Sequence, residues 1–480
     1  MAAFHNRSVE AAILRGALAS KRSELFIVYG RRGVGKSALI ESAVSEAAPM
    51  GVFYRATRRT LSLQLADLTE AARISFPNAF LGQPFESFGV FLGFLAHQAR
   101  EQDEPVVVVI DELPYLADVD PGLLTVIQNW WDANKTLPNL KVFLAGSYVA
   151  FMERQVLDAN APLYNRRTGA MRLEPLDYAA AALFFPHYTP EDKVAAYAIL
   201  GGMPSYLEQF DPGRSVEENV KATALRRNTY LSEEPNWLLL EDLRRDVVHG
   251  SILRAIAAGQ RKPSDIARAI GKTSAQDVAP HLATLQDLGL VVREIPVTEH
   301  SHSRSRTSLY NIADNYLSFW YRYVDPSLGL VTRGLGDRIW EASVAPTLHE
   351  FISRPAFERV CRQYLWRALA QDALPEGLTF SDVGSWWGAG DVEIDAVAVD
   401  ERRRPTLCGS CKWTNSPVDV REYAALQLAV SRAGFGEAPG LALFSRSGFT
   451  PRLTELAAGQ SPQRLLLVDL DALFNLAPVF

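Results

Sequence analysis

Residues 30–37 carry the pattern Gly-x-x-x-x-Gly-Lys-Ser directly after an apolar run at 25–29. Glycines let the backbone bend so that several N–H groups point at one anion, and a helix beginning near Lys36 presents its positive end to the same anion. Lys36 can reach the β- and γ-phosphates of a nucleotide, and the Ser37 hydroxyl can bind Mg²⁺. The pattern between a strand and a helix predicts a site for ATP or ADP. The predicted nucleotide-binding residues are Gly30, Arg31, Arg32, Gly33, Val34, Gly35, Lys36, Ser37 and Ala38.

Two acids follow a second apolar run, at 105–110. Such a run is typical of a parallel strand buried on both faces. At its end, Asp111 is expected to lie beside the phosphate loop and to hold Mg²⁺ together with Ser37. Glu112 is placed to orient or deprotonate the attacking water. The pair predicts hydrolysis of ATP to ADP and phosphate; the alternative is a buried strand followed by an acidic helix cap.

Three further residues are candidates for the same chemistry. Ser147 ends a strand predicted over 141–147 and suits contact with the γ-phosphate or the lytic water, although a plain strand end fits equally well. The turn-rich basic segment 162–169 contains Arg166 and Arg167. Either arginine could stabilise transition-state charge in its own subunit or in a neighbour, and a solvated loop is the equal alternative.

These side chains need a sheet that brings the ends of its strands together. Apolar runs predict several strands that alternate with helical segments, which indicates a doubly wound α/β sheet. The predicted strands are 25–29, 52–55, 105–111 and 141–147, and the helical segments are 61–75, 85–102 and 120–135.

Size and composition limit the number of domains and the classes of function. The 480 residues are 48% hydrophobic, which predicts roughly three domains with real cores. The net charge of −6 means that binding to nucleic acid needs a local basic patch. Three cysteines are too few for a disulfide framework. No signal peptide or membrane span is predicted, so we expect a soluble, cytoplasmic protein with no membrane partner.

The middle of the chain has the rhythm of a helix-turn-helix. Three helical stretches over about 249–288 and two extended segments, near 291–295 and 308–312, predict a winged helix. The connecting tip at 300–306 holds Arg304 and Arg306 and no acid, which suits the phosphates of double-stranded DNA. Acidic residues on the third helix oppose this interpretation, so a protein-contact or regulatory module is the alternative.

A hairpin predicted over 393–412 is the second chemical focus. Strand alternation places Glu393 and Asp395 on one face, and Ser410 and Lys412 on one face. This hairpin resembles the core of PD-(D/E)xK nucleases, in which an Asp, a second acid and a Lys bind Mg²⁺ and activate water.

The resemblance assigns Asp395 and Lys412 to that core and Glu358, on the preceding helix, to an accessory acid. Ser410 stands where the pattern has Glu or Gln, and a hydroxyl is a poor replacement for a carboxylate on Mg²⁺. Glu393 or Glu358 would have to supply the missing oxygen. Cleavage, and a retained fold that binds nucleic acid or protein, both stay open.

Nearly the whole chain resembles the archaeal-type P-loop ATPases of the STAND superfamily, which are related to AAA+ proteins. The matching segments are 6–7, 30–37, 110–115, 144–147, 151–153, 162–167 and 200–204. In that family the start of the chain lies near the nucleotide, so the resemblance makes Arg7 a candidate contact, and the Gly-Gly-x-Pro turn at 201–204 belongs to a helical lid.

The resemblance implies a multidomain α/β protein. Its parts are a P-loop ATPase core (1–175), a helical lid (176–245), a winged helix (246–330) and a restriction-endonuclease-like α/β domain (345–480). The first function hypothesis is an ATP-driven switch or motor that acts on DNA. The second is a signalling NTPase whose C-terminal domains bind protein partners without nuclease activity. Oligomers are possible in both.

Overall fold

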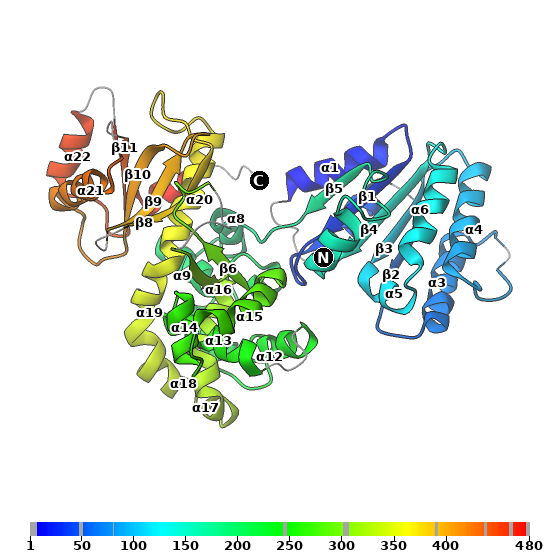
Figure 1. The fold of residues 1–480 in the computed structure, drawn as a ribbon, viewed down its shortest axis with the longest axis horizontal. Helices are drawn as coiled ribbons and strands as arrows, with labels where there is room; N and C mark the ends of the chain where they lie inside the picture. The colour runs from blue at the N-terminus through cyan, green and yellow to red at the C-terminus, as the bar shows by residue number, and fades with distance from the viewer. Residues whose placement is uncertain are drawn as a thin grey trace. The chain divides into compact units, whose positions relative to one another are not determined.

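The chain forms two compact units in the computed structural model, Met1–Pro175 and Leu176–Val479 (Figure 1). The structure describes residues 7–47, 51–79, 81–242, 247–300, 307–388, 392–435, 439–459 and 464–476. Within these ranges, no helix has both the length and the apolar character needed to span a lipid bilayer.

The first unit is built on a five-stranded parallel sheet with the order β2-β3-β4-β1-β5. β3 and β4 are buried along their whole length, as expected for apolar strands covered on both faces. The predicted parallel α/β sheet is therefore confirmed. The strands are β1 (Glu24–Tyr29), β2 (Gly51–Arg55), β3 (Val106–Asp111), β4 (Leu140–Gly146) and β5 (Gly169–Arg172).

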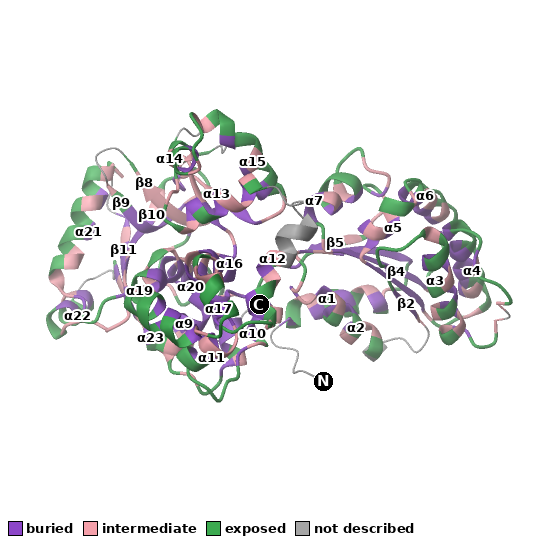
Figure 2. Cartoon of the chain, turned by 90° about the horizontal axis from the view of Figure 1, so that it is seen from below, coloured by how far each residue is buried: buried purple, intermediate pink, exposed green. Residues whose placement is uncertain are grey.

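Helices cover both faces of this sheet. Figure 2 shows α1 and α2 on one side of the buried strands and α5 and α6 on the other. The helix predicted over 61–75 is confirmed as α3, and the one predicted from 85 begins later, at Phe88, because Ser87 caps it by accepting a hydrogen bond from the N–H of Val90. The helices are α1 (Ser8–Ala19), α2 (Lys36–Ala47), α3 (Leu61–Ser75), α4 (Phe88–Glu101), α5 (Leu113–Val119), α6 (Leu123–Asn134) and α7 (Val149–Phe151), which continues as a π-helix over Met152–Leu157.

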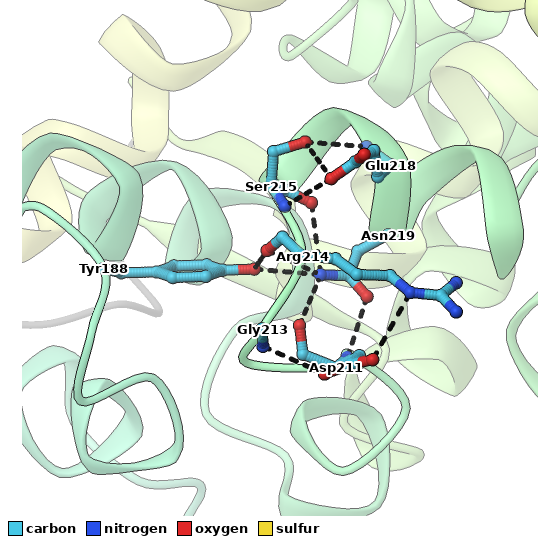
Figure 3. A network of polar contacts seen from close by, with 7 residues as sticks. All are labelled: Tyr188, Asp211, Gly213, Arg214, Ser215, Glu218 and Asn219. Carbon is cyan, nitrogen blue, oxygen red and sulfur yellow. Dashed lines mark hydrogen bonds and ion pairs between the residues drawn. The ribbon is translucent and has the colours of Figure 1, made fainter.

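The second unit begins with short helices joined by tight turns. In Figure 3 the side chain of Asn219 fixes one of these turns: its amide donates to the carbonyls of Asp211, Arg214 and Ser215 and to the Tyr188 hydroxyl. This buried amide satisfies backbone carbonyl groups of the turn. The helices are α8 (Tyr178–Ala181), α9 (Pro190–Leu200), α10 (Pro204–Leu207), α11 (Val216–Ala222) and α12 (Tyr230–Asp242).

Three helices and a two-stranded antiparallel sheet follow, in the order that the sequence predicts for a winged helix. Val291 of β6 lies opposite Ile312 of β7. The tip of the connecting segment, with Arg304 and Arg306, lies outside the described residues. The elements are α13 (Val247–Ala257), α14 (Pro263–Ala269), α15 (Ala275–Asp287), β6 (Val291–Glu294) and β7 (Leu309–Ile312).

An aromatic helix connects these elements to the C-terminal part of the unit. Tyr316, Phe319 and Trp320 are fully buried, so this stretch forms core packing. The helices are α16 (Asn315–Phe319), α17 (Leu328–Thr332), α18 (Gly336–Ile339), α19 (Ala345–Phe351) and α20 (Glu358–Ala370).

The unit ends in a mixed five-stranded sheet with the order β12-β11-β10-β9-β8. β9 and β10 form the predicted hairpin, whereas β11 pairs parallel with β10 and β12 pairs parallel with β11. The strands are β8 (Asp382–Trp387), β9 (Glu393–Val399), β10 (Pro405–Lys412), β11 (Gly440–Ser445) and β12 (Leu465–Asp469), and the helices are α21 (Val420–Ala433), α22 (Pro451–Ala458) and α23 (Leu470–Asn475).

Candidate active site

The phosphate loop connects the end of β1 to the start of α2, as the pattern predicts. Gly30 has φ +152°, and a Cβ built on it would lie 2.3 Å from the carbonyl oxygen of Leu173. A side chain would therefore meet backbone as well as an unfavourable conformation. This close packing holds the first glycine of the loop against the segment that follows β5.

Lys36 turns its ammonium group back into the loop. Nζ donates to the carbonyl oxygens of Gly30 at 2.8 Å and Arg31 at 3.1 Å. Burial lowers the pKa of Lys36, whereas the charges of Glu112 and Asp111 act in the opposite direction. A buried ammonium within the loop is suited to pair with an anion that enters it.

Asp111 and Ser37 are brought together, although 74 positions separate them in the sequence. The Ser37 hydroxyl donates to Oδ2 of Asp111 at 2.6 Å, and the backbone N–H of Glu112 donates to Oδ1 at 3.0 Å. Asp111 is 1% exposed. A carboxylate and a hydroxyl are oxygen ligands of the kind that Mg²⁺ takes, so the donor set fits the predicted ion.

Glu112 follows β3 with a left-handed backbone, φ 57° and ψ 46°. Its Oε2 accepts hydrogen bonds from the Ser147 hydroxyl at 2.6 Å and from the Ser147 N–H at 3.2 Å. A non-glycine residue with positive φ is uncommon and is found where a side chain must be aimed. The strand end at Ser147 therefore contacts Glu112, and a contact of Ser147 with phosphate or water stays a prediction.

Arg7 contacts the backbone of the phosphate loop. Its guanidinium donates to the carbonyl of Val34 at 3.3 Å and of Glu174 at 2.6 Å, and it pairs with Glu10 at 2.8 Å. These contacts link the start of the chain to the loop. A direct contact with nucleotide stays a prediction.

Arg166 and Arg167 lie at the other edge of the sheet. β5 runs parallel to β1 with Gly169 opposite Phe26, and both arginines precede Gly169, whereas the phosphate loop leaves the far end of β1. Four strand residues span about 13 Å. Arg166 is also paired with Asp132 at 2.7 Å. A role in the same subunit does not fit this geometry, and a role in a neighbour stays a prediction.

Arg55 is a site residue that the sequence analysis misses. It ends β2 directly opposite Asp111 in the strand register, and its Nε donates to Oδ2 of Asp111 at 3.0 Å. Glu41 lies 3.8 Å from the same guanidinium. Only its position could have indicated this role. Arg55 is a charged residue at the end of a predicted strand, and in a parallel sheet that strand could lie beside the one that carries Asp111.

Replacing Arg55 by alanine should destabilise the first unit without ligand by about 1–2 kcal/mol, because buried Asp111 loses a charged partner and the half-exposed arginine is partly screened. Mg²⁺ supplies another cation for Asp111, so Mg·ATP should raise the melting temperature more in Arg55→Ala than in the unmodified protein. Thermal unfolding with and without Mg·ATP measures this.

The control is Arg59→Ala, because Arg59 pairs with exposed Asp67 at 2.7 Å and should respond to Mg·ATP like the unmodified protein. A smaller Mg·ATP shift in Arg55→Ala would contradict the expectation and would indicate that Arg55 contacts the bound nucleotide.

In the second unit, three carboxylates converge on one arginine. The Arg354 guanidinium lies 2.9 Å from Glu358, 2.9 Å from Glu393 and 3.2 Å from Asp395. Burial, together with the charge of Asp395, raises the pKa of Glu358 to about 7, against the effect of the neighbouring arginines. We call Glu358, Glu393 and Asp395 the carboxylate cluster.

The other two predicted nuclease-like residues lie beside this cluster. Oδ2 of Asp395 accepts from the Cys411 N–H at 2.8 Å and from the Ser410 hydroxyl at 3.4 Å. Nζ of Lys412 pairs with Glu422 of α21 at 3.1 Å. In the described part of the chain, no group of three or more acidic, histidine or cysteine side chains is arranged to hold a metal ion. Because the Arg354 guanidinium pairs with all three carboxylates, the residues as they stand do not fit the metal that a nuclease-like site implies.

Comparisons with known proteins match two separate regions of the chain. Residues 4–210 match a family described as an ATPase domain predominantly from Archaea. Residues 320–424 match the DUF234 family, described as archaeal and bacterial proteins of unknown function.

An uncharacterized protein of Methanocaldococcus jannaschii is 26% identical over 413 residues, which span 85% of this chain and 87% of that protein. A Walker-type ATPase of Pyrococcus abyssi has a similar structure: 22% identity, a TM-score of 0.50, and coverage of 66% of this chain and 96% of that chain. The ORC2 protein of Aeropyrum pernix is more distant, with 14% identity, a TM-score of 0.42, and coverage of 70% of this chain and 95% of that chain. The chain thus contains a P-loop ATPase domain of the archaeal type, joined to a region that matches DUF234.

Proposed function

We propose that this protein hydrolyses ATP and uses the cycle to drive a switch or motor that acts on double-stranded DNA. The observation that carries hydrolysis is the position of Glu112. Ser147 holds its carboxylate by two hydrogen bonds, directly after Asp111, whose carboxylate is bonded to Ser37 of the phosphate loop. The phosphate loop, the proposed metal-binding pair of Ser37 and Asp111, and the proposed base Glu112 therefore lie at the same edge of the sheet.

The proposed step is an in-line attack of water on the γ-phosphorus. Glu112 accepts a proton from the water, a new P–O bond forms, the bond to the β-phosphate oxygen breaks, and ADP leaves as phosphate is formed. Lys36 offsets charge on the β- and γ-phosphates, and Ser37 and Asp111 would hold Mg²⁺, which stabilises charge on the same oxygens when bound. Ser147 keeps the Glu112 carboxylate in place.

DNA is the proposed partner because the middle of the second unit has the element order of a winged helix with a basic tip. α13, α14 and α15 followed by the β6–β7 pair support a winged helix. Its connecting tip carries Arg304 and Arg306 in a polar sequence without acids at 300–306. Such a segment offers positive charge to phosphates even though the chain as a whole carries a net charge of −6.

A signalling NTPase that binds protein partners is the second candidate. The observation that favours it is Arg354, which pairs with all three members of the carboxylate cluster, while Lys412 pairs with Glu422. A C-terminal domain with these side chains engaged in ion pairs is better suited to binding than to cleavage.

ATP hydrolysis with and without linear duplex DNA separates the two candidates. We expect DNA to stimulate hydrolysis several-fold, because a DNA-driven switch couples the two binding events. Lys36→Ala, which removes the charge that binds phosphate, gives the background rate.

The variant Arg304→Ala/Arg306→Ala should lose the stimulation and keep the basal rate. Arg402→Ala/Arg404→Ala is the matched control, because it removes two arginines with the same spacing from the turn between β9 and β10. Hydrolysis that is indifferent to DNA, above the Lys36→Ala background, would favour the signalling candidate.

A further inference from the structure

The carboxylate cluster already contains a cation from the protein itself. Arg354 places one guanidinium within hydrogen-bond distance of Glu358, Glu393 and Asp395, with each nitrogen directed to a different carboxylate. These acids come from α20 and β9, two elements that are not adjacent in sequence. Three acids meeting at one point need a positive charge to offset their repulsion, and Arg354 supplies it.

The backbone next to α20 directs Arg354 to this position. Arg354 has φ −139° and ψ 131°, an extended conformation within an otherwise helical stretch, and Pro355 follows it. A residue before proline avoids the helical region, so the sequence itself favours this break. The break turns the side chain towards Glu358, four residues on, and towards β9.

A second arginine adds positive charge beside the cluster. Arg362, one turn further along α20, lies 3.9 Å from Glu358 and donates to the carbonyl oxygen of Asp395 at 2.7 Å. In the Asp395 side chain, Oδ1 accepts from Arg354, and Oδ2 accepts from the Ser410 hydroxyl and the Cys411 N–H of β10. A divalent ion would need the same carboxylate oxygens and would meet the positive charge of Arg354 at the centre of the cluster.

We infer that Arg354 is the resident cation of the carboxylate cluster, in the place where a nuclease of the resembling type holds a divalent metal ion. The C-terminal domain of this chain therefore works without a metal at that position. The inference is independent of ATP hydrolysis, because every residue that carries it lies in the second unit.

Counting bound Mn²⁺ by electron paramagnetic resonance, on the full chain without nucleotide, tests this inference. Arg354→Met keeps the apolar stem of the side chain and removes the charged guanidinium. We expect Arg354→Met to bind about one more Mn²⁺ per chain than the unmodified protein, through the freed carboxylates. Arg354→Met/Asp395→Asn should lose that ion, and Arg354→Lys should not gain it.

Arg421→Met is the matched control, because Arg421 is exposed, pairs with Asp419 two residues away at 2.7 Å, and should leave the Mn²⁺ count unchanged. Mn²⁺ bound near the phosphate loop is common to all variants and cancels in the comparison. Thermal unfolding gives a second readout: Mn²⁺ should raise the melting temperature of Arg354→Met more than that of the unmodified protein.

Two results would overturn the inference. In one, the unmodified protein binds an Mn²⁺ ion that Asp395→Asn removes, so that a metal and Arg354 share the cluster. In the other, Arg354→Met folds but gains no Mn²⁺, so that the carboxylates cannot replace the arginine with a metal. If Arg354→Met does not fold, the unmodified protein is compared with Asp395→Asn instead. The inference expects these two proteins to bind the same number of Mn²⁺ ions, and a lower number in Asp395→Asn would overturn it.

Discussion

Glu112→Gln is expected to lower the rate of ATP hydrolysis by about 10²- to 10⁴-fold while leaving ATP binding nearly unchanged. A glutamine has the same shape and can still accept from the Ser147 hydroxyl, which lies 2.6 Å from Oε2 of Glu112. It cannot take a proton from water. The effect should therefore fall on kcat and spare the affinity for nucleotide.

Steady-state phosphate release and binding of a fluorescent ATP analogue measure the two quantities on the same preparation. Glu104→Gln is the control, because Glu104 is exposed, precedes β3 and should leave both quantities unchanged. If Glu112→Gln still hydrolysed ATP within about threefold of the unmodified rate, Glu112 would not be the base, and a group at another strand end would have to be sought.

The ATPase unit could be predicted from sequence because its signals are local. The run 105–110 identifies β3 and fixes Asp111 and Glu112 at the end of that strand, and the glycine pattern fixes Lys36 and Ser37 at the start of α2. Parallel strands then bring these residues to one edge of the sheet without further information. The hairpin of β9 and β10 was equally visible, since alternation and a polar turn mark it.

Contacts between distant residues could not be predicted in the same way. Arg55 pairs with Asp111 across 56 positions and Arg354 with Asp395 across 41, and neither arginine stands in a recognisable pattern. Both depend on which strand or helix break lies beside the acid, and this is known only from the assembled sheet. β5 was missed for a related reason: its four residues are too few to show a period.

The location of Arg166 and Arg167 illustrates the same limit. Their charge and the turn-rich sequence indicate a candidate for stabilising the transition state. The register of β5 against β1 places them at the edge away from the phosphate loop. Charge and spacing say what a residue can do, whereas sheet order decides which ligand it can reach.

A second large effect is expected at the Gly-Gly-x-Pro turn between α9 and α10. A Cβ built on Gly202 would lie 1.8 Å from the carbonyl oxygen of Leu176, and the Leu176 N–H donates to the Gly202 carbonyl at 2.8 Å. The obstacle is backbone, which cannot move aside as the end of a flexible side chain can. Gly202→Ala should therefore destabilise the second unit by about 3 kcal/mol or more.

Urea unfolding followed by circular dichroism, with Gly250→Ala as the matched control, tests this expectation. Gly250 lies within α13, and the nearest atom to a Cβ there is the end of the Arg254 side chain at 3.9 Å, so alanine should stabilise that helix by about 0.5–1 kcal/mol. Opposite signs for the same chemical change in one unit would assign the loss at Gly202 to the contact with Leu176. An equal, small effect at both positions would show that the turn can adjust, so that the close approach of 176 to 202 does not constrain this segment.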